Sequence, residues 1–198
     1  MYYIHGYLSE PYSTKGTLLK ERLNVIPIKY RDCKPEDLII SDCIERIISE
    51  IKNDKEPILI GSSLGGLLAV KVAKKTKIKQ LILLNPAIIP NYVDISKIWD
   101  MPHNILKDMK DESLFKEKID SKINIIVGTM DDTVPNDWVI EFAKAQEATL
   151  LLLHDDHSLT QNLEKIPDII KSYQNSIQSF AGIDKNKPSF KREKDDWY

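Results

Sequence analysis

The sequence has few cysteines, and this scarcity argues against a fold held by disulfides. Only two occur in 198 residues, whereas small secreted domains that depend on disulfides are dense in cysteine. Cys33 and Cys43 could pair in principle. Neither belongs to a Cys-x-x-Cys motif, and both flank or lie in a predicted helix, so we interpret them as reduced thiols.

The sequence also lacks an excess of charge of one sign and lacks long apolar runs. Its formal net charge is −2, with lysines dispersed among acids, so no overall field attracts nucleic acid or anionic lipid. No stretch approaches the roughly 20 apolar residues of a membrane span. No basic segment followed by an apolar one marks a signal peptide. These absences predict no nucleic-acid partner, no membrane span and a cytoplasmic location, and they leave the oligomeric state open.

What the sequence does contain suits one domain with one well-packed core. Hydrophobic residues make up 42% of the chain and charged residues 29%. Residues 1–182 are predicted to form that domain, and residues 183–198 a charged C-terminal tail. The alternative for the tail is an arm that packs against the domain.

Short apolar runs alternate with longer helical patterns over most of the chain, which is typical of a parallel sheet with crossover helices. This alternation predicts an α/β protein, a three-layer αβα sandwich with a mostly parallel sheet of about six strands. The predicted strands are residues 2–4, 25–28, 57–60, 80–84, 123–127 and 149–153. The predicted helices are residues 36–53, 64–76, 136–146 and two short segments after His157 divided by Pro167, the last capped by Gly182.

Residues 87–118 interrupt this alternation, because they join two strands over more chain than one helix needs. We interpret them as a small partial lid. Trp99, Met101 and Met109 are its candidates for the apolar wall of a substrate pocket. The alternative is that they pack a short helix on the core.

The motif Gly61-Ser62-Ser63-Leu64-Gly65 carries the strongest chemical signal. It reads G-x-S-x-G between a predicted strand and a predicted helix, which is the context of a nucleophile elbow. The small residues two positions on either side of Ser63 let strand and helix pass closely. With only seven glycines in the chain, such a pattern seldom arises by chance. The motif predicts Ser63 as a nucleophile.

A serine nucleophile needs a general base that is oriented by a carboxylate, and both candidates follow later strands. Asp131 comes three residues after Gly128, and its neighbour Asp132 is the competing acid, since one of the two could cap the next helix. His157 is the predicted base, ahead of His154, which we expect to continue the preceding strand. The order serine, acid, histidine agrees with one site at the carboxyl edge of a sheet.

Two histidine segments admit other interpretations. His154 and His157 enclose two aspartates, but as a metal site they would need a helical segment and a further ligand, so we predict no metal. We interpret His5 as part of a turn. There Gly6 would let the amide of Tyr7 join the amide of Leu64 in an oxyanion hole.

Four segments together resemble the short serine esterases of the α/β-hydrolase superfamily, and within it a small, largely uncharacterised subgroup with minimal lids. The resemblance implies Ser63 as nucleophile, Asp131 as acid, His157 as base and the Tyr7 and Leu64 amides as oxyanion donors, without a cofactor. Two leading antiparallel strands common in larger members are absent. The segments are Tyr3-Ile4-His5-Gly6-Tyr7-Leu8-Ser9, Gly61-Ser62-Ser63-Leu64-Gly65, Leu84-Asn85-Pro86-Ala87, and Gly128-x-x-Asp131 with Asp156-His157-Ser158.

The expected function is hydrolysis of a small-molecule carboxylic ester with a short to medium acyl chain, through an acyl-serine intermediate. The same triad serves thioesterases and amidases, and a non-enzymatic ligand-binding protein on this fold would show the same residues. A nucleotide-binding domain is disfavoured, because neither G-x-G-x-x-G after the first strand nor G-x-x-x-x-G-K-[ST] is present.

Overall fold

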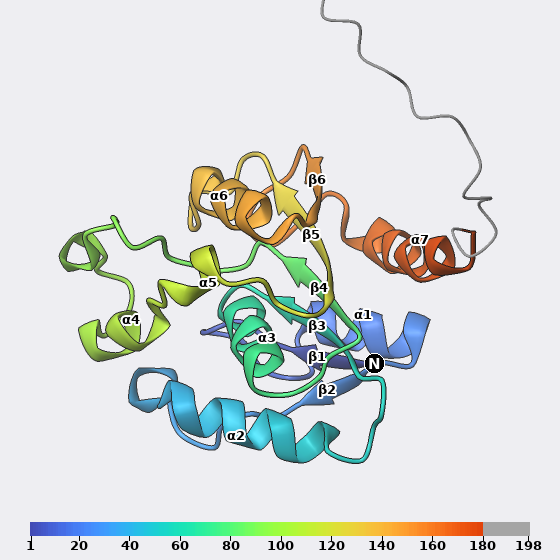
Figure 1. The fold of residues 1–198 in the computed structure, drawn as a ribbon, viewed down its shortest axis with the longest axis horizontal. Coiled ribbons are helices and arrows are strands. Elements are labelled where there is room, and N and C mark those ends of the chain that lie inside the picture. Colours follow the sequence, from blue (N-terminus) through green and yellow to red (C-terminus); the bar gives the residue numbers. More distant parts are fainter. Residues whose placement is uncertain (180–198) are drawn as a thin grey trace, which may run out of the picture.

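A sheet of six strands lies at the centre of the protein (Figure 1). The structure is a computed structural model that describes residues 1–179, with side chains described through Gln174. All neighbouring strands pair in parallel, in the order β2-β1-β3-β4-β5-β6. The predicted fold class is confirmed, and each strand lies within two residues of its predicted bounds. The strands are β1 Tyr2–Ile4, β2 Ile26–Ile28, β3 Ile58–Ser62, β4 Gln80–Leu84, β5 Lys122–Gly128 and β6 Thr149–Leu153.

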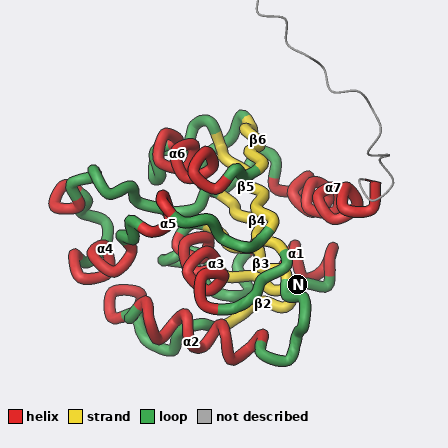
Figure 2. The backbone as a smooth tube through the Cα atoms, viewed as in Figure 1, coloured by secondary structure: helices red, strands yellow, loops and turns green. Residues whose placement is uncertain are grey.

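Helices cover both faces of this sheet, as Figure 2 shows in red around the yellow strands. Side chains alternate between the faces along each strand. Leu59 and Leu83 therefore belong to one apolar core, with α2, α3 and α6, whereas Ile60 and Ile82 belong to a second, with α1 and α7. The helices are α1 Thr14–Leu23, α2 Ile40–Ile51, α3 Leu64–Lys75, α4 His103–Met109, α5 Ser113–Lys116, α6 Asn136–Gln146 and α7 Ile166–Ser179.

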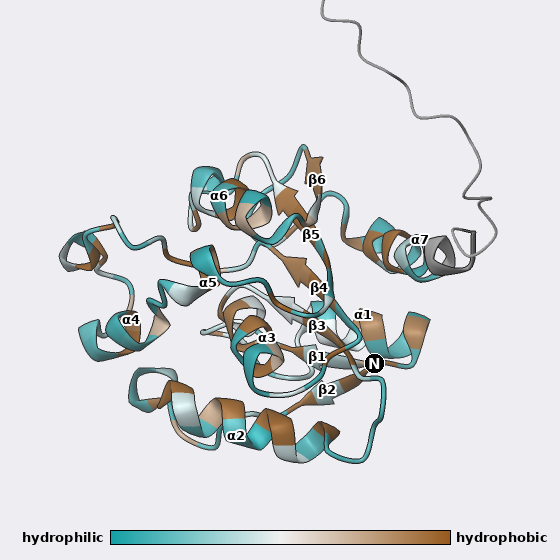
Figure 3. Ribbon diagram, viewed as in Figure 1, coloured by the Kyte–Doolittle hydropathy of each residue, from teal (hydrophilic) through white to brown (hydrophobic). Residues whose placement is uncertain are grey.

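Helix α2 illustrates how the apolar pattern positions an element. Ile40, Ile44, Ile47 and Ile51 are buried, and their spacing of three and four residues puts them on one helix face. Hydrophobic and hydrophilic stretches alternate along this helix in Figure 3. The predicted range of 36–53 was too long at its start, because the 3-10 helix Pro35–Asp37 ends at an extended Leu38 before α2 begins.

Two helices differ from the sequence prediction. Helix α1 was not predicted, because its ten residues include four charged side chains and one glycine and bury only Gly16 and Leu19. Pro167 does not divide two helices but lies in the first turn of α7, where a missing amide hydrogen costs no intrahelical bond. The predicted tail at residues 183–198 and the cap at Gly182 lie outside the described residues.

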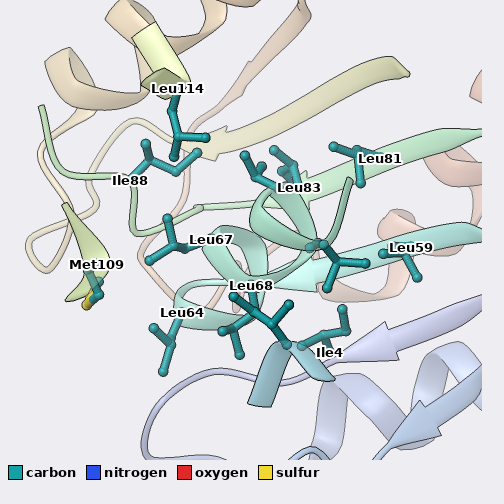
Figure 4. Close-up of a cluster of buried hydrophobic side chains, with 14 of the residues drawn as sticks. Ile4, Leu59, Leu64, Leu67, Leu68, Leu81, Leu83, Ile88, Met109 and Leu114 are labelled. Atoms are coloured by element: carbon teal, nitrogen blue, oxygen red, sulfur yellow. The ribbon is translucent and has the colours of Figure 1, made fainter. Parts of the chain in front are cut away.

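The segment 87–118 packs on the core through short elements rather than one long helix. It contains the 3-10 helix Ile95–Lys97 together with α4 and α5. Its buried side chains Ile88, Met109 and Leu114 gather near Leu64 and Leu67 of α3 (Figure 4). Within residues 1–179, no helix is long and apolar enough to cross a membrane.

Candidate active site

The predicted site residues follow four parallel strands at the point where each strand ends. Tyr7 follows β1, Ser63 follows β3, Asp131 follows β5 and His157 follows β6. Because parallel strands end at the same edge of a sheet, these loops meet at the carboxyl edge. The topology thus brings residues far apart in the sequence to one place.

Ser63 occupies a strained backbone conformation between β3 and α3. Its φ is 53° and its ψ is −121°, a region that a residue with a side chain adopts at a cost. A Cβ on Gly61 would lie 2.4 Å from the carbonyl oxygen of Gly65, and a Cβ on Gly65 would lie 2.1 Å from that of Ile4. Both glycines are required by close backbone packing, as the G-x-S-x-G motif predicted.

Hydrogen bonds from β4 and the loop after it hold this turn. The amide of Ser63 donates to the carbonyl of Leu84 at 3.0 Å, and the amide of Ala87 donates to the carbonyl of Ser63 at 3.0 Å. The neighbouring strand therefore fixes the Ser63 backbone on both sides, and the surrounding structure over-determines the strained conformation.

Asp131 and His157 form a pair, and His157 lines the same cavity as Ser63. The distance from His157 Nδ1 to Asp131 Oδ2 is 2.8 Å. The other carboxylate oxygen, Oδ1, accepts the amides of Thr133 at 2.9 Å and Val134 at 2.8 Å. The Asp131 side chain is 1% exposed. These bonds fix one face of the carboxylate and leave the other to orient the imidazole through Nδ1.

The two competing residues lie elsewhere. Asp132 is exposed, and its carboxylate accepts only the hydroxyl of Thr133, at 3.3 Å, among the bonds recorded for the described chain. His154 is exposed as well, directly after β6 ends at Leu153, so it does not continue the strand as expected. The geometry selects the Asp131 and His157 pair.

Asn85 holds the loop that carries His157, a role that the sequence did not reveal. It is 1% exposed. Its side-chain amide donates to the carbonyls of Asp156 at 3.2 Å and His157 at 2.8 Å, and its carbonyl accepts the amide of Gly128 at 2.8 Å. One side chain thus ties the ends of β4 and β5 to the histidine loop.

Asp155 fixes the same loop from within. Its buried carboxylate accepts the amides of Asp156, Gln161 and Asn162. Burial opposes ionisation of Asp155, but these hydrogen bonds outweigh it, so its pKa lies below the usual value. The carboxylate is therefore a structural acceptor for the loop.

The loop after β1 approaches the nucleophile closely. A Cβ on Gly6 would lie 3.3 Å from Ser63 Cβ and 3.9 Å from Ser63 Oγ. Within residues 1–179, neither the amide of Tyr7 nor that of Leu64 donates a recorded hydrogen bond. Leu64 is the first residue of α3, where an amide lacks an intrahelical acceptor and the helix dipole is positive. Among the described residues, these two amides therefore have no hydrogen-bond acceptor, as the predicted oxyanion donors would require.

His5 is part of the core of this loop and not a proton carrier. It is fully buried, and its ring stacks on Tyr30 at a centroid distance of 4.3 Å. Burial lowers the pKa of His5 to about 4, although its bond to the Gly6 carbonyl acts in the opposite direction. The neutral ring supports the loop, in agreement with the interpretation of His5 as part of a turn.

Arg31 holds the same loop in place through hydrogen bonds. The sequence did not identify this residue. Its guanidinium, 5% exposed, donates from Nη1 to the carbonyl of Tyr7 at 3.1 Å and to the Tyr30 hydroxyl at 3.3 Å. From Nη2 it donates to the carbonyl of Ser9 at 2.9 Å. The planar fork binds two carbonyls of one loop at once, and so fixes the peptide units around Tyr7.

A cavity of about 920 Å³ opens over these residues and is lined by Ser63 and His157. Trp99, Met101 and Met109, the predicted wall residues, line it as well. They differ in exposure: Met109 is buried in the core, whereas Trp99 is 88% exposed. Met109 therefore also serves the packing role that was the alternative interpretation. No group of three or more metal-ligating side chains suited to a metal ion occurs in the described part of the chain.

A nucleophile elbow at the carboxyl edge of a parallel sheet, with an acid and a histidine after later strands, defines an α/β-hydrolase fold. Solved structures agree: Est1E from Butyrivibrio proteoclasticus with ferulic acid bound matches with a TM-score of 0.74 and 22% identity, over 90% of this chain and 88% of that chain. A monoacylglycerol lipase from Paleococcus ferrophilus matches with a TM-score of 0.67 and 16% identity, over 88% and 93%. The esterase Pf2001 from Pyrococcus furiosus matches with a TM-score of 0.66 and 18% identity, over 90% and 81%.

The chain belongs to the Uncharacterised protein family UPF0227, whose family model matches residues 1–174. No curated protein matches it.

Proposed function

We propose that this protein is a serine hydrolase that cleaves carboxylic esters of short to medium acyl chains through an acyl-serine intermediate. The observation that carries the proposal is the pair of His157 Nδ1 and Asp131 Oδ2, 2.8 Å apart, with His157 lining the same cavity as Ser63 on its strained turn. Structural neighbours named as an esterase and a lipase support the same class of reaction.

In the proposed reaction, the oxygen of Ser63 attacks the ester carbonyl while Nε2 of His157 takes its proton. Asp131 stabilises the resulting imidazolium, and the amides of Tyr7 and Leu64 bind the oxyanion. His157 then returns the proton to the leaving alcohol. A water molecule, activated in the same way, hydrolyses the acyl-enzyme and restores Ser63.

Labelling with a fluorophosphonate probe, followed by mass spectrometry of the adduct, tests this proposal. The probe phosphonylates an activated serine without requiring a known substrate. We expect one adduct, on Ser63, that is lost in Ser63→Ala and His157→Ala. The neighbouring serine and the neighbouring histidine supply matched controls, so Ser62→Ala and His154→Ala should still be labelled.

Hydrolysis of p-nitrophenyl butyrate should fall to background in Ser63→Ala. A wild-type protein that the probe leaves unlabelled, while a control esterase reacts, would refute the proposal and favour a ligand-binding protein on this fold. Full esterase activity in Ser63→Ala would refute the assigned nucleophile.

A further inference from the structure

Lys15 is a half-buried cation in the wall of the cavity, on the helix that the sequence did not predict. It lies in the first turn of α1, where the helix dipole is unfavourable for a positive charge. Its side chain turns toward β3, and Nζ donates to the hydroxyl of Ser62, the residue before the nucleophile, at 3.1 Å. Lys15, Ser62 and Ser63 all line the same cavity.

Among the side chains that the structure describes, the ammonium group of Lys15 has no ion-pair partner. No carboxylate of the described residues lies within 4.0 Å of it, and Ser62 is its only recorded hydrogen-bond acceptor. An ammonium group carries three donors, so two of them are left for another acceptor. Removing an ammonium group even partly from water without giving it partners is costly, and the position of Lys15 at the cavity suggests that a ligand supplies them.

Three aspartates near Lys15 do not serve as that partner. Burial lowers the pKa of Lys15 to about 8, although Asp156, Asp155 and Asp131 attract its charge. Their carboxylates are engaged elsewhere: Asp131 with His157, Asp155 with loop amides and Asp156 with Thr160. Their attraction thus falls short of what burial costs the charged form. A ligand anion in contact with Nζ would stabilise the charged form of Lys15 further.

The rest of the cavity lining contains both polar and apolar side chains. Beside Lys15, the lining includes Ser13 and Tyr3. Burial raises the pKa of Tyr3 to about 12, while the side chains of Ser13 and Ser62 act in the opposite direction. The segment 87–118 supplies apolar lining such as Met101 and Met109, together with the charged Lys97 and Asp100. A substrate with both an apolar part and an anionic group fits this mixed lining.

We propose that Lys15 forms an anion subsite of this cavity and that the substrate is an ester carrying a carboxylate, which the Lys15 ammonium binds. That the substrate is an ester rests on the proposed function, whereas the anion subsite does not. Lys97 also lines the cavity, but its side chain is 82% exposed and lies 4.0 Å from Asp94. It therefore provides a matched control with the same charge.

Non-hydrolysable ketones that mimic the ester test the subsite without turnover. In one pair, 5-oxo-5-phenylpentanoate is compared with valerophenone, in which a methyl group replaces the carboxylate on the acyl side. In the other pair, 4-butyrylbenzoate is compared with 4′-methylbutyrophenone, with the change on the alcohol side. Their Kd values are measured by calorimetry on the full chain with Ser63→Ala, which prevents addition of the serine to the ketone.

We expect the carboxylate to bind at least about ten-fold more tightly than the methyl analogue in one of the two pairs, which also shows on which side Lys15 acts. Adding Lys15→Met should remove this preference, whereas Lys97→Met should keep it. Lys15→Arg, which retains the charge, should keep a part of it. Circular dichroism verifies that each variant is folded.

The pH dependence provides a test that needs no change at Lys15. Because the ammonium loses its proton above about pH 8, the preference for the carboxylate should weaken between pH 7 and roughly pH 9.5. Equal Kd values within both pairs, or a preference that survives Lys15→Met, would overturn the subsite. Failure of Ser63 to react with fluorophosphonate would overturn the esterase proposal, and the Kd values would still decide the subsite.

Discussion

At the scale of single residues, the candidate site depends on side chains that are held in one orientation by additional hydrogen bonds. Asp131 is the clearest case, because one carboxylate oxygen accepts two backbone amides while the other meets His157. Its neighbour Asp132 has the same chemistry but is exposed. The difference between the two lies in their partners and not in residue type.

Replacing Asp131 with asparagine should abolish most of the activity. The asparagine oxygen would keep accepting the amides of Thr133 and Val134, so its NH₂ group would face His157 Nδ1 and favour the tautomer with a protonated Nε2. That tautomer cannot act as the base for Ser63. We expect kcat for p-nitrophenyl butyrate to fall by roughly 10³- to 10⁴-fold, and Asp132→Asn to change it by less than about three-fold. Similar losses in both variants would contradict the assignment.

Because His5 is buried, its protonation should make the stability of the protein depend on pH. Its pKa is about 4 in the folded chain, against 6.5 for an ordinary histidine. A histidine with a lowered pKa favours folding while it is neutral, so its contribution is present above about pH 6.5 and is lost as the pH falls toward 4. Between the two extremes of pH, this contribution to the free energy of unfolding amounts to about 3 kcal/mol.

Urea unfolding at several pH values between 4.5 and 7 tests this prediction. The wild-type free energy of unfolding should decrease as the pH falls, and His5→Phe should make that decrease smaller. The exposed His154→Phe should leave the pH dependence unchanged. If His5→Phe had the wild-type pH dependence, the buried neutral state of His5 would be wrong.

At the scale of elements, the loop after β1 is positioned by the segment that follows β2. Arg31 follows β2, and its guanidinium holds the carbonyls of Tyr7 and Ser9, while the Tyr30 hydroxyl donates to the carbonyl of Gly6 at 3.2 Å. The amide of Tyr7 therefore takes its orientation from the chain after β2. In the proposed mechanism this makes Arg31 a positioning residue.

Removal of the Arg31 guanidinium should slow the chemical step more than it weakens substrate binding. For Arg31→Met we expect kcat to fall by roughly 10- to 100-fold with KM changed by less than about three-fold, because an oxyanion donor acts mainly in the transition state. Arg31→Lys should not restore kcat, since an ammonium cannot span both carbonyls. Labelling by fluorophosphonate should slow in parallel.

Arg46→Met serves as the control for that prediction. Arg46 is exposed and pairs with Asp32 on the surface, so its loss should leave kcat unchanged. Thermal unfolding of each variant separates a misplaced loop from a destabilised fold. An increase in KM without a change in kcat for Arg31→Met would indicate a role in substrate binding instead.

At the scale of the whole molecule, the size of the cavity and the helices that cover it limit the length of the acyl chain that the proposed substrate can carry. Between β4 and β5, the structure has only short helices, of which α4 with seven residues is the longest. The cavity of about 920 Å³ has room for a small ester. Between β4 and β5, it has no long helical cover that would bury an extended lipid chain.

A series of p-nitrophenyl esters from acetate to palmitate tests this expectation. We expect kcat/KM to be greatest between butyrate and octanoate and to fall at least about ten-fold at palmitate, measured below the aggregation limit of each ester. Since Trp99 is exposed at the cavity, Trp99→Ala should affect the longer esters more than acetate. A maximum at palmitate would contradict the proposed acyl length.

The sequence predicted the sheet well, because each strand is a short apolar run bounded by polar segments, as in residues 80–84. It also predicted the strand-to-helix turn at Ser63, since Gly61 and Gly65 mark a turn that few other sequences can form. It did not reveal α1, whose pattern is weakly apolar, or the contacts of Asn85. A hydrogen bond from Asn85 to a carbonyl some 70 residues later along the chain leaves no periodic signal.

The sequence by itself therefore determined the class of fold, the nucleophile elbow and the order of serine, acid and histidine, because these depend on local patterns and on strands that end at one edge. Only the tertiary structure paired Asp131 rather than Asp132 with His157, placed Arg31 on the loop after β1 and brought Lys15 beside Ser62. Those choices depend on contacts between residues that are distant in the sequence, and such contacts exist only once the chain has folded.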